Sequence, residues 1–502
     1  MRLIAYMKPY AHWVIFALLL VLGLTAFDLY RPMLVGDAID TFGANGDYDV
    51  IIATAIKYAV VLALSFAFNI AQTWILQKTG QNIILQMRKD LYRHIQSLGS
   101  RYFDITPVGK LVTRVTNDVE ALNEMYSGIL VQLFRNIVKI VGLAGVMLVL
   151  DVRLAAISFV LMPLVIGLTV LCQKIARNIY RLYRTRLTDI NTFLSEHLSG
   201  MKIIQIFGRQ ERKFEEFHDK NTKLYKAFYR EMLMYAVFRP LIYILSILSL
   251  MIVLWFGSRN VFDEIISVGT LYIFSNYIRS FFDPIQELAE QFSTLQSSIA
   301  SAEKIFTVMD EDEFIPEVEN PKQPDKITGK IEFDHVWFAY DGENYVLKDV
   351  SFVINPGEKV AFVGATGAGK SSILNLIGRY YDIQKGHIYI DGIDIRQLSK
   401  KQLRSAIGQM QQDVFIFEGD VAYNIRLNDD NITDAQVKAA AEYVNASHFI
   451  EKLPQGYHEP VTERGSTFSA LLLREKAKSY CPLQGHLPTI RAYWSWTRQP
   501  PT

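Results

Sequence analysis

The sequence predicts a membrane all-α domain of six helices, followed by an α/β domain of the P-loop type. Three observations lead to this fold class. Six long apolar segments lie in the first 282 residues, a glycine-rich loop follows a short apolar run further along, and the composition changes near residue 320 from apolar and aromatic to charged. The chain has 502 residues and is 50% hydrophobic, which is unusual for a soluble enzyme and leaves room for more than one domain.

The apolar segments are long enough to cross a bilayer, which takes roughly 20 mostly apolar residues. Three of them carry no charged side chain, and several uncharged runs of this length argue against the alternative of buried helices in a soluble core. The third contains Arg135 and Lys139, whose long side chains can extend toward the interface, and the last, with Arg279, is the weakest. The six segments are 11–30, 58–76, about 129–150, 154–172, 240–257 and about 265–282.

Basic residues predict which side of the membrane each connection occupies, because cytoplasmic loops are enriched in Lys and Arg. They gather between the second and third segments and after the fourth, whereas the stretch after the first segment is acidic. The basic residues include Lys78, Arg88, Lys89, Arg93, Arg101, Lys110, Arg114, Lys174, Arg177, Arg181, Arg184 and Arg186, and the acidic ones are Asp37, Asp40, Asp47 and Asp49. We therefore expect a multi-pass protein of the cytoplasmic membrane with both termini and the α/β domain in the cytoplasm.

The two basic stretches are too long to be simple connections between helices. Polar residues recur at helical spacing in "ILQMRKDLYRHIQSL" and in "IARNIYRLYRTRLTDINTFLSEHL". We expect the membrane-spanning helices to continue well beyond the bilayer. A pair of separate peripheral helices is the alternative.

The second domain begins after the Pro-containing stretch "EDEFIPEVENPKQPDK". The alternating run "KIEFDHVWFAY" predicts a strand, and "KVAFV" predicts a short buried strand. Directly afterwards, "GATGAGKS" fits the P-loop pattern G-x-x-x-x-G-K-[ST]. A glycine-rich turn alone often has no function, but this one follows a predicted strand and precedes a predicted helix.

The P-loop pattern predicts a cradle for the phosphates of ATP. Its glycines let backbone N–H groups approach the phosphates, and the helix that follows adds its positive N-terminal end. Lys370 is expected to neutralise the β- and γ-phosphates, and the Ser371 hydroxyl to ligate Mg²⁺. The candidate binding residues are Gly364, Ala365, Thr366, Gly367, Ala368, Gly369, Lys370, Ser371 and Ser372.

Six spans with a P-loop domain resemble a half-subunit of a type I ATP-binding cassette (ABC) exporter, and the resemblance extends to Ala470. The run "FDITPVGKLVTRVTNDVEALNE" resembles the first intracellular coupling segment of such exporters, and "GMKIIQIFGRQERKFEEF" the segment leading into the second. The resemblance implies that these ends rest on nucleotide-binding domains and relay their movement. Residue types alone would predict solvated helix-turn faces. The matching residues of the first segment are Phe103, Asp104, Pro107, Gly109, Arg114, Asn117 and Asp118.

The resemblance also assigns roles in the nucleotide-binding domain. It implies that Tyr340 stacks on adenine, although a buried strand tyrosine is the alternative, and that Gln412 senses Mg²⁺ and the attacking water. "ERG" at 463–465 resembles a cross-linking loop found just ahead of the family signature, and "QMQQDVFIFEGDVAYN" resembles one half of heterodimeric bacterial multidrug exporters. The implied partners are a second half-transporter, identical or different, and a hydrophobic cargo such as drugs or lipids. The net charge of +1 gives no drive toward nucleic acid.

The resemblance stops after Ala470. "FSA" begins a signature whose Gly and Gln do not follow, and the sequence shows neither the apolar strand ending in Asp-Glu nor the later switch histidine. In the reading frame formed by the last base of each codon and the first two of the next, Tyr493–Trp494 encodes Leu and Trp496–Thr497 encodes Asp. "YWSWTRQPPT" is then compatible with Leu-Val-Leu-Asp-Glu-Ala-Thr-Ala-Asn. We interpret the tail as frameshifted; a divergent tail is the alternative.

These observations predict three parts: a transmembrane domain over 1–320, a partial nucleotide-binding domain over 321–470 and an aberrant tail over 471–502. The missing strand belongs beside the P-loop strand, so its loss is expected to leave unpaired backbone and exposed apolar surface. We expect this chain to bind ATP weakly through Tyr340, Lys370 and Ser371 but not to hydrolyse it. The predicted function is ATP-driven export as one half of a dimer. The alternatives are a non-hydrolysing regulatory half and a non-functional pseudogene product.

Overall fold

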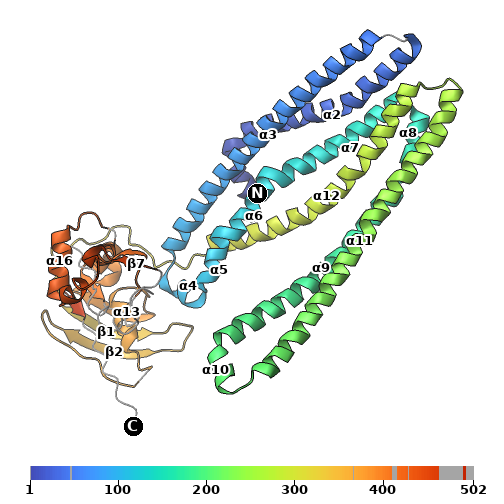
Figure 1. Cartoon of the computed structure of the whole chain (residues 1–502). Coiled ribbons are helices and arrows are strands. Elements are labelled where there is room, and N and C mark those ends of the chain that lie inside the picture. The colour runs from blue at the N-terminus through green and yellow to red at the C-terminus, as the bar shows by residue number, and fades with distance from the viewer. Residues whose placement is uncertain are drawn as a thin grey trace. The chain divides into compact units, whose positions relative to one another are not determined.

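The computed structural model describes residues 2–45, 48–365, 367–409, 415–427, 429–462 and 490–492 (Figure 1). The chain divides into two compact units. The first comprises Met1–Gln96 and Gly109–Asp310 and is helical; the second comprises Ser97–Val108 and Glu311–Thr502 and contains the strands. The second unit therefore includes a short piece of the chain that the sequence places between the second and third membrane segments.

Helices form at all six predicted membrane segments. Among the described residues, five helical stretches are long and apolar enough to cross a bilayer: Arg2–Gly43, Tyr48–Ser97, Val108–Leu150, Val152–Ser199 and Gln210–Phe262. The sixth segment lies in helix α12, which is less apolar and is not among these stretches. The helices of this unit are α1 (Arg2–Met7), η1 (Lys8–Tyr10), α2 (Ala11–Asn45), α3 (Tyr48–Ser97), α5 (Val108–Thr113), η2 (Arg114–Asp118), α6 (Val119–Glu124), η3 (Met125–Ile129), α7 (Leu130–Leu150), α8 (Val152–Phe159), α9 (Met162–Ser199), α10 (Met201–Ile206), α11 (Gln210–Phe262) and α12 (Val268–Met309).

Helix α12 contributes a buried face to the helical core despite its lower hydropathy. Phe274, Tyr277 and Ile278 are at most 1% exposed and pack with residues of α7, α8, α9 and α11. The Tyr277 hydroxyl donates to the carbonyl oxygen of Leu29 in α2 at 2.5 Å. Packing against other helices therefore holds α12, so it depends less on apolar contact with lipid than its neighbours do.

The long helices confirm that the spanning segments continue past the bilayer. Helix α3 runs for 50 residues without interruption, α9 for 38 and α11 for 53. At a rise of 1.5 Å per residue, α11 is about 80 Å long, more than twice the roughly 30 Å of hydrocarbon in a bilayer. Continuous helices, and not separate peripheral ones, therefore form both quoted stretches, the first as far as Ser97.

The first part of the acidic stretch, with Asp37 and Asp40, is helical and not a loop, because α2 continues to Asn45. Asp40 accepts hydrogen bonds from the Gly269 backbone N–H at 2.7 Å and from the Ser267 hydroxyl at 2.5 Å, so it caps the start of α12. The two helices approach so closely here that a Cβ atom on Gly269 would lie 2.1 Å from the carbonyl oxygen of Gly36. Asp40 and this glycine contact join α2 to α12.

The second unit is built on an antiparallel sheet with strand order β2–β1–β3–β4. The alternation predicted for β1 is confirmed on each side of an irregularity between Phe333 and Val336, since Ile331, Phe333, Val336 and Phe338 are buried. Phe333 lies opposite Phe352 of β2, with ring centroids 4.4 Å apart. The strands are β1 (Ile331–Phe338), β2 (Leu347–Ile354), β3 (Lys385–Ile390) and β4 (Ile393–Asp394), and the main helices are α4 (Ser100–Ile105), α13 (Lys370–Ile377), α14 (Lys400–Ser405), α15 (Val421–Arg426), α16 (Asp434–Tyr443) and α17 (Ser447–Ile450).

The strand predicted for "KVAFV" is wrong. Residues 359–364 form no strand, and Val360 is 43% and Val363 91% exposed. A strand needs a neighbour to satisfy its backbone groups, and none of the described strands pairs with this segment. A parallel pairing in this unit joins β5 (Ile407–Gln409) to β8 (Ile490–Ala492) instead.

Candidate functional site

The P-loop region lies between Gly364 and the first turn of α13. Gly367 and Gly369 have φ values of +87° and +82°, a left-handed backbone that favours glycine. A Cβ atom on Gly369 would also lie 2.6 Å from the Leu347 side chain of β2. The glycines are therefore required for the loop to turn into α13 while it remains packed on the sheet.

Lys370 holds its ammonium group against the loop that precedes it. Its Nζ donates to the carbonyl oxygens of Gly364 at 2.9 Å and Ala365 at 2.7 Å. The positive charge therefore lies at the N-terminus of α13, where backbone N–H groups and the helix dipole also favour an anion. Gly364, Ala365, Gly367 and Ala368 are exposed, so this face of the loop is accessible to a ligand.

The two serines at the start of α13 differ in environment. Ser371 is exposed in the first turn, so its hydroxyl is available to ligate a cation. Ser372 is only 4% exposed, and its Oγ accepts a hydrogen bond from the Tyr340 hydroxyl at 3.0 Å. The structure therefore ties Ser372 to Tyr340, while Ser371 faces solvent.

Tyr340 follows directly after β1 and Ala339, beside α13. Its ring is half-buried and packs edge-on against Phe338, with centroids 4.7 Å apart, and against Tyr381, with centroids 5.0 Å apart. The alternative interpretation required a buried tyrosine inside the strand, but Tyr340 is only half-buried and lies after the strand. Part of its surface remains available to a planar ligand.

Two predicted site residues, Thr366 and Gln412, lie outside the described residues. In the part of the chain that is described, His, Cys, Asp and Glu side chains form no cluster of three that could hold a metal ion. Of the residues in this part, Ser371 is the one predicted to contact Mg²⁺. The phosphates of a bound nucleotide would supply further oxygen ligands.

The segment Ser97–Val108 contacts the nucleotide-binding part of its unit. The Tyr381 hydroxyl donates to the Asp104 carboxylate. Arg101 lies 3.4 Å from the Glu313 carboxylate and 3.7 Å from that of Asp341. A cavity of about 230 Å³ adjoins these residues and is lined by α4, the Glu313–Ile315 stretch and the aromatic groups around Tyr340.

Burial and the bond to Asp104 both raise the pKa of Tyr381, so its hydroxyl stays protonated and remains a donor at neutral pH. Sequence reasoning singled out Asp104 but missed Tyr381 as its partner. The local signal for Tyr381 was the aromatic pair in "GRYYD" after the P-loop helix. Sequence reasoning also missed the pairing of Arg101 with Glu313 and Asp341.

A charged group within the helical unit was also missed. Arg135 of α7 was expected to extend toward the interface, but its Nη2 lies 3.5 Å from the Asp28 carboxylate of α2. Arg31 also pairs with Asp28. Charges are costly in a membrane unless they are paired, so the attraction of Asp28 outweighs extension toward the headgroups.

Two family models match the chain. The model for the ABC transporter transmembrane region matches residues 14–285, and the ABC transporter model matches residues 347–470. The first match alone covers more than half of the chain.

Curated relatives match over most of the chain. The ABC transporter ATP-binding protein exp8 of Streptococcus pneumoniae is 37% identical over 470 residues, which are 93% of this chain and 80% of that protein. YheH of Bacillus subtilis, whose name describes a multidrug resistance ABC transporter ATP-binding/permease protein, is 36% identical over 82% of this chain and 62% of its own length. A fatty acid ABC transporter ATP-binding/permease protein of Mycobacterium bovis is 34% identical over 82% of this chain and 65% of its own length.

Proposed function

Because this chain belongs to the ABC transporter family, whose members couple ATP hydrolysis to transport, we propose that it is one half of a dimeric exporter for hydrophobic compounds. The cargo class is drugs or lipids. Support for it comes from the relatives named for multidrug resistance and for fatty acid transport. The nucleotide-binding domain and both termini lie in the cytoplasm, in accord with the basic residues between the spans.

The observation that carries this proposal is the P-loop geometry in a chain with five span-length helices. Lys370 is positioned over an exposed loop at the start of α13, and Tyr340 lies beside the same helix. ATP binds with its phosphates at 364–372 and its adenine on Tyr340, and Ser371 together with Gln412 contacts Mg²⁺. Phosphoryl transfer to water in such a site depends on positioning and charge neutralisation.

The tip between α9 and α11 supports a partner subunit. Helix α10 and the residue after it expose Ile203, Ile206 and Phe207 to 62%, 68% and 71%. Apolar side chains grouped at an exposed tip favour contact with another protein surface. In a dimer, this tip docks on the nucleotide-binding domain of the other half-transporter.

The chain as printed is incompetent for hydrolysis. Its tail after Ala470 is an out-of-frame translation, and the Asp-Glu pair that would order Mg²⁺ and water is absent from the sequence. Two observations support this view: the ABC transporter match extends to residue 470, and Val360 and Val363 are exposed where a central strand was expected. Reading the coding DNA in its other two frames tests the frameshift, and the absence of an Asp-Glu strand there would refute it.

A second candidate function is a half-transporter that binds nucleotide without hydrolysing it, while its partner hydrolyses. The resemblance of 409–424 to one half of heterodimeric exporters favours this candidate. The residue after Asp in the concealed strand decides between the two: Glu supports a catalytic half and any other residue a regulatory one. A non-functional pseudogene product is a third possibility, and pulse-chase survival in membranes separates it from both.

The primary test is photolabelling of the full chain with an azido-ATP analogue. We expect labelling that unlabelled ATP displaces, that Lys370→Ala abolishes and that the exposed control Lys359→Ala leaves unchanged. Phosphate release should stay at background in the printed chain and rise when residues 471–502 are replaced by the other reading frame. If Lys370→Ala is labelled as strongly as wild type, the proposed nucleotide site is wrong. If the chain with its present tail hydrolyses ATP, the assignment of hydrolysis to the concealed strand is wrong. Transport into vesicles with a co-purified partner identifies the cargo.

A further inference from the structure

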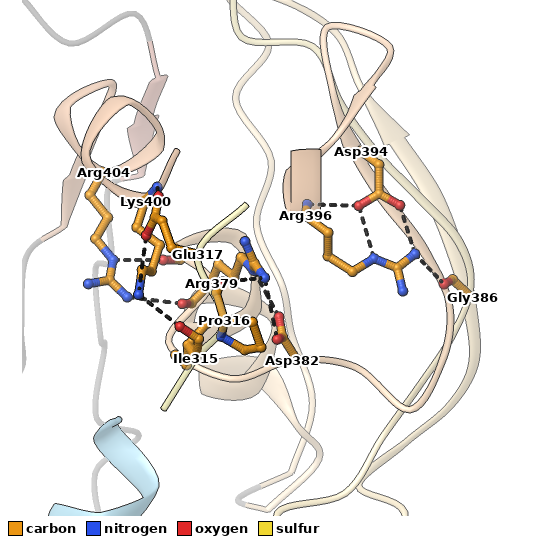
Figure 2. Close-up of polar contacts among 11 residues, drawn as sticks. Ile315, Pro316, Glu317, Arg379, Asp382, Gly386, Asp394, Arg396, Lys400 and Arg404 are labelled. Carbon is orange, nitrogen blue, oxygen red and sulfur yellow. Dashed lines mark hydrogen bonds and ion pairs between the residues drawn. The ribbon is translucent and has the colours of Figure 1, made fainter. Parts of the chain in front are cut away.

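The chain that joins the last membrane helix to the nucleotide-binding domain is fastened to that domain by two cations (Figure 2). Arg379 Nη2 donates to the carbonyl oxygen of Pro316 at 3.0 Å. Lys400 Nζ donates to the carbonyl oxygen of Ile315 at 2.8 Å and lies 3.2 Å from the Glu317 carboxylate, which also accepts from the Lys400 backbone N–H at 2.9 Å. We call these five residues, Ile315, Pro316, Glu317, Arg379 and Lys400, the linker clasp.

Arg379 is held rigidly in the turn that ends α13. Its side chain is 4% exposed, and its Nε donates to Asp382 at 2.9 Å. Its φ of +46° is left-handed, a conformation that a residue other than glycine keeps only when its surroundings enforce it. Arg404 donates to the carbonyl oxygens of Gly378 and Arg379 at 3.2 and 3.0 Å and fixes the turn from the other side.

The two clasp cations come from elements that the chain joins to the predicted nucleotide site. Helix α13 begins at Lys370 and has its C-cap at Gly378, so the P-loop and Arg379 lie at opposite ends of one short helix, about 12 Å long. Lys400 begins α14, which leads through Ala406 into β5 and then into the stretch that contains Gln412. A shift of either element therefore acts directly on the clasp.

The chain just before the clasp also contacts the residues that lead into the coupling segment. The Gly99 backbone N–H donates to the carbonyl oxygen of Glu313 at 2.7 Å, and Arg101 pairs with the Glu313 side chain. On its other side, the stretch is covalently continuous with α12, which ends at Met309. Residues 313–317 thus link the P-loop helix, α14, the residues that lead into the coupling segment and the last membrane helix.

The charge states suit this arrangement. Partial burial opposes ionisation of Glu317, but the hydrogen bonds from Lys400 outweigh it and lower the pKa of that carboxyl. Glu317 is therefore ionised at neutral pH and pairs with the Lys400 ammonium.

We propose that Arg379 and Lys400 are positioning residues that make the linker a second path, besides the coupling segment, by which nucleotide binding reaches α12. The proposal rests on nucleotide binding at Lys370. The two residues do not touch the nucleotide; they fix 315–317 to α13 and α14, so that closure of the P-loop around phosphate tightens the linker.

The test is cleavage of the full chain by a Glu-specific protease, because the linker contains Glu311, Glu313, Glu317 and Glu319. Without nucleotide, we expect Lys400→Met to be cut in the linker about tenfold faster than wild type, because the clasp no longer opposes local opening. The neighbouring exposed Lys401→Met is the matched control and should change the rate by less than about twofold. Lys400→Arg, which keeps the charge, should restore most of the protection.

The second arm adds a non-hydrolysable ATP analogue with Mg²⁺. Wild type and Lys401→Met should be cut several-fold more slowly than without analogue, whereas Lys400→Met and Arg379→Met should bind the analogue but lose this response. Because Arg379 is buried, Arg379→Met could unfold the domain, so its cleavage is compared only if its unfolding transition matches that of wild type. Lys400 is partly exposed, so Lys400→Met decides the test.

Equal nucleotide-dependent protection in Lys400→Met and wild type would overturn the proposal. If wild type binds no analogue, the proposed function is wrong. The cleavage rates without nucleotide still test whether Lys400 holds the linker against local opening.

Discussion

Two segments of the nucleotide-binding domain, one in the antiparallel sheet and one before the P-loop, have sequences that predict a strand equally clearly. Only the first of them forms a strand. In the antiparallel half, "IEFDHVWF" forms β1 with its apolar residues buried. In the other half, "KVAFV" is no less apolar, but it forms no strand and leaves Val363 91% exposed. The local pattern is similar, so the difference must come from the partners available to each segment.

Strand β1 obtains both of its partners from nearby sequence. It pairs with β2, which begins nine residues after β1 ends, and with β3, and the registers place Ile331 beside Ile354 and Ile390. Under the function proposed above, the segment 359–364 would take its neighbour from beyond residue 470, where the ABC transporter match ends. A strand thus becomes stable only when the chain supplies the strand next to it.

The largest effect expected in this comparison is that of Phe333→Ala in the intact half. Phe333 is 2% exposed and stacked on Phe352, so the truncation removes buried contacts and leaves a cavity. We expect a loss of about 4 kcal/mol in the unfolding free energy of this domain and a fall of roughly 10 °C in its melting temperature. Thermal unfolding of the full chain, followed by tryptophan fluorescence, checks it; a fall of less than about 2 °C would show that the antiparallel half is also incompletely packed.

The second prediction concerns Asp394, the last residue of β4 in the antiparallel sheet. Its side chain is 9% exposed and pairs with His387 at 2.9 Å. It also pairs with Arg396 at 2.7 Å (Figure 2). Burial favours the protonated form, but these hydrogen bonds outweigh it and lower the pKa of Asp394 to about 2. A lowered pKa gives stability that is present above the usual value and is lost as pH falls through the folded-state value, here from about pH 5 to pH 2.

The Asp394 contribution is about 2 kcal/mol at neutral pH. Asp394→Asn should lower the melting temperature at pH 7 and flatten its decline in acid. Asp430→Asn, at an exposed position, is the control. An unchanged acid profile in Asp394→Asn would mean that other carboxylates dominate the acid transition.

The parts that sequence predicted correctly depend on local information. The membrane helices follow from hydropathy, the continuous extensions from helical periodicity, and the loop at Lys370 from a pattern that spans eight residues. The parts that it missed depend on pairs far apart in the chain: Arg135 with Asp28, Tyr381 with Asp104, and Arg379 with Pro316. Each residue taken alone fits many environments, and only the packed fold selects one.

The third prediction tests one of these long-range pairs. Tyr381→Phe removes the donor to Asp104 but keeps the aromatic packing with Tyr340 and Phe338. Because Asp104 is exposed and water can replace the lost donor, we expect a cost of about 1 kcal/mol. The melting temperature of the domain measures it, with Tyr443→Phe at another exposed position as the comparison. A cost as large as that of Phe333→Ala would place Tyr381 in the structural core and not at a replaceable contact.

The smallest effect is expected in the half that contains "KVAFV". Val363→Ala removes an exposed side chain, so it should change the unfolding free energy of the printed chain by no more than about 0.5 kcal/mol. In a chain whose residues 471–502 are replaced by the other reading frame, the restored strand would cover Val363. The same substitution should then cost about 2 kcal/mol, because it removes buried methyl groups. An equal, small cost in both chains would show that the concealed strand does not pair with the P-loop segment, and the difference between the two halves would then need a cause other than a missing neighbour.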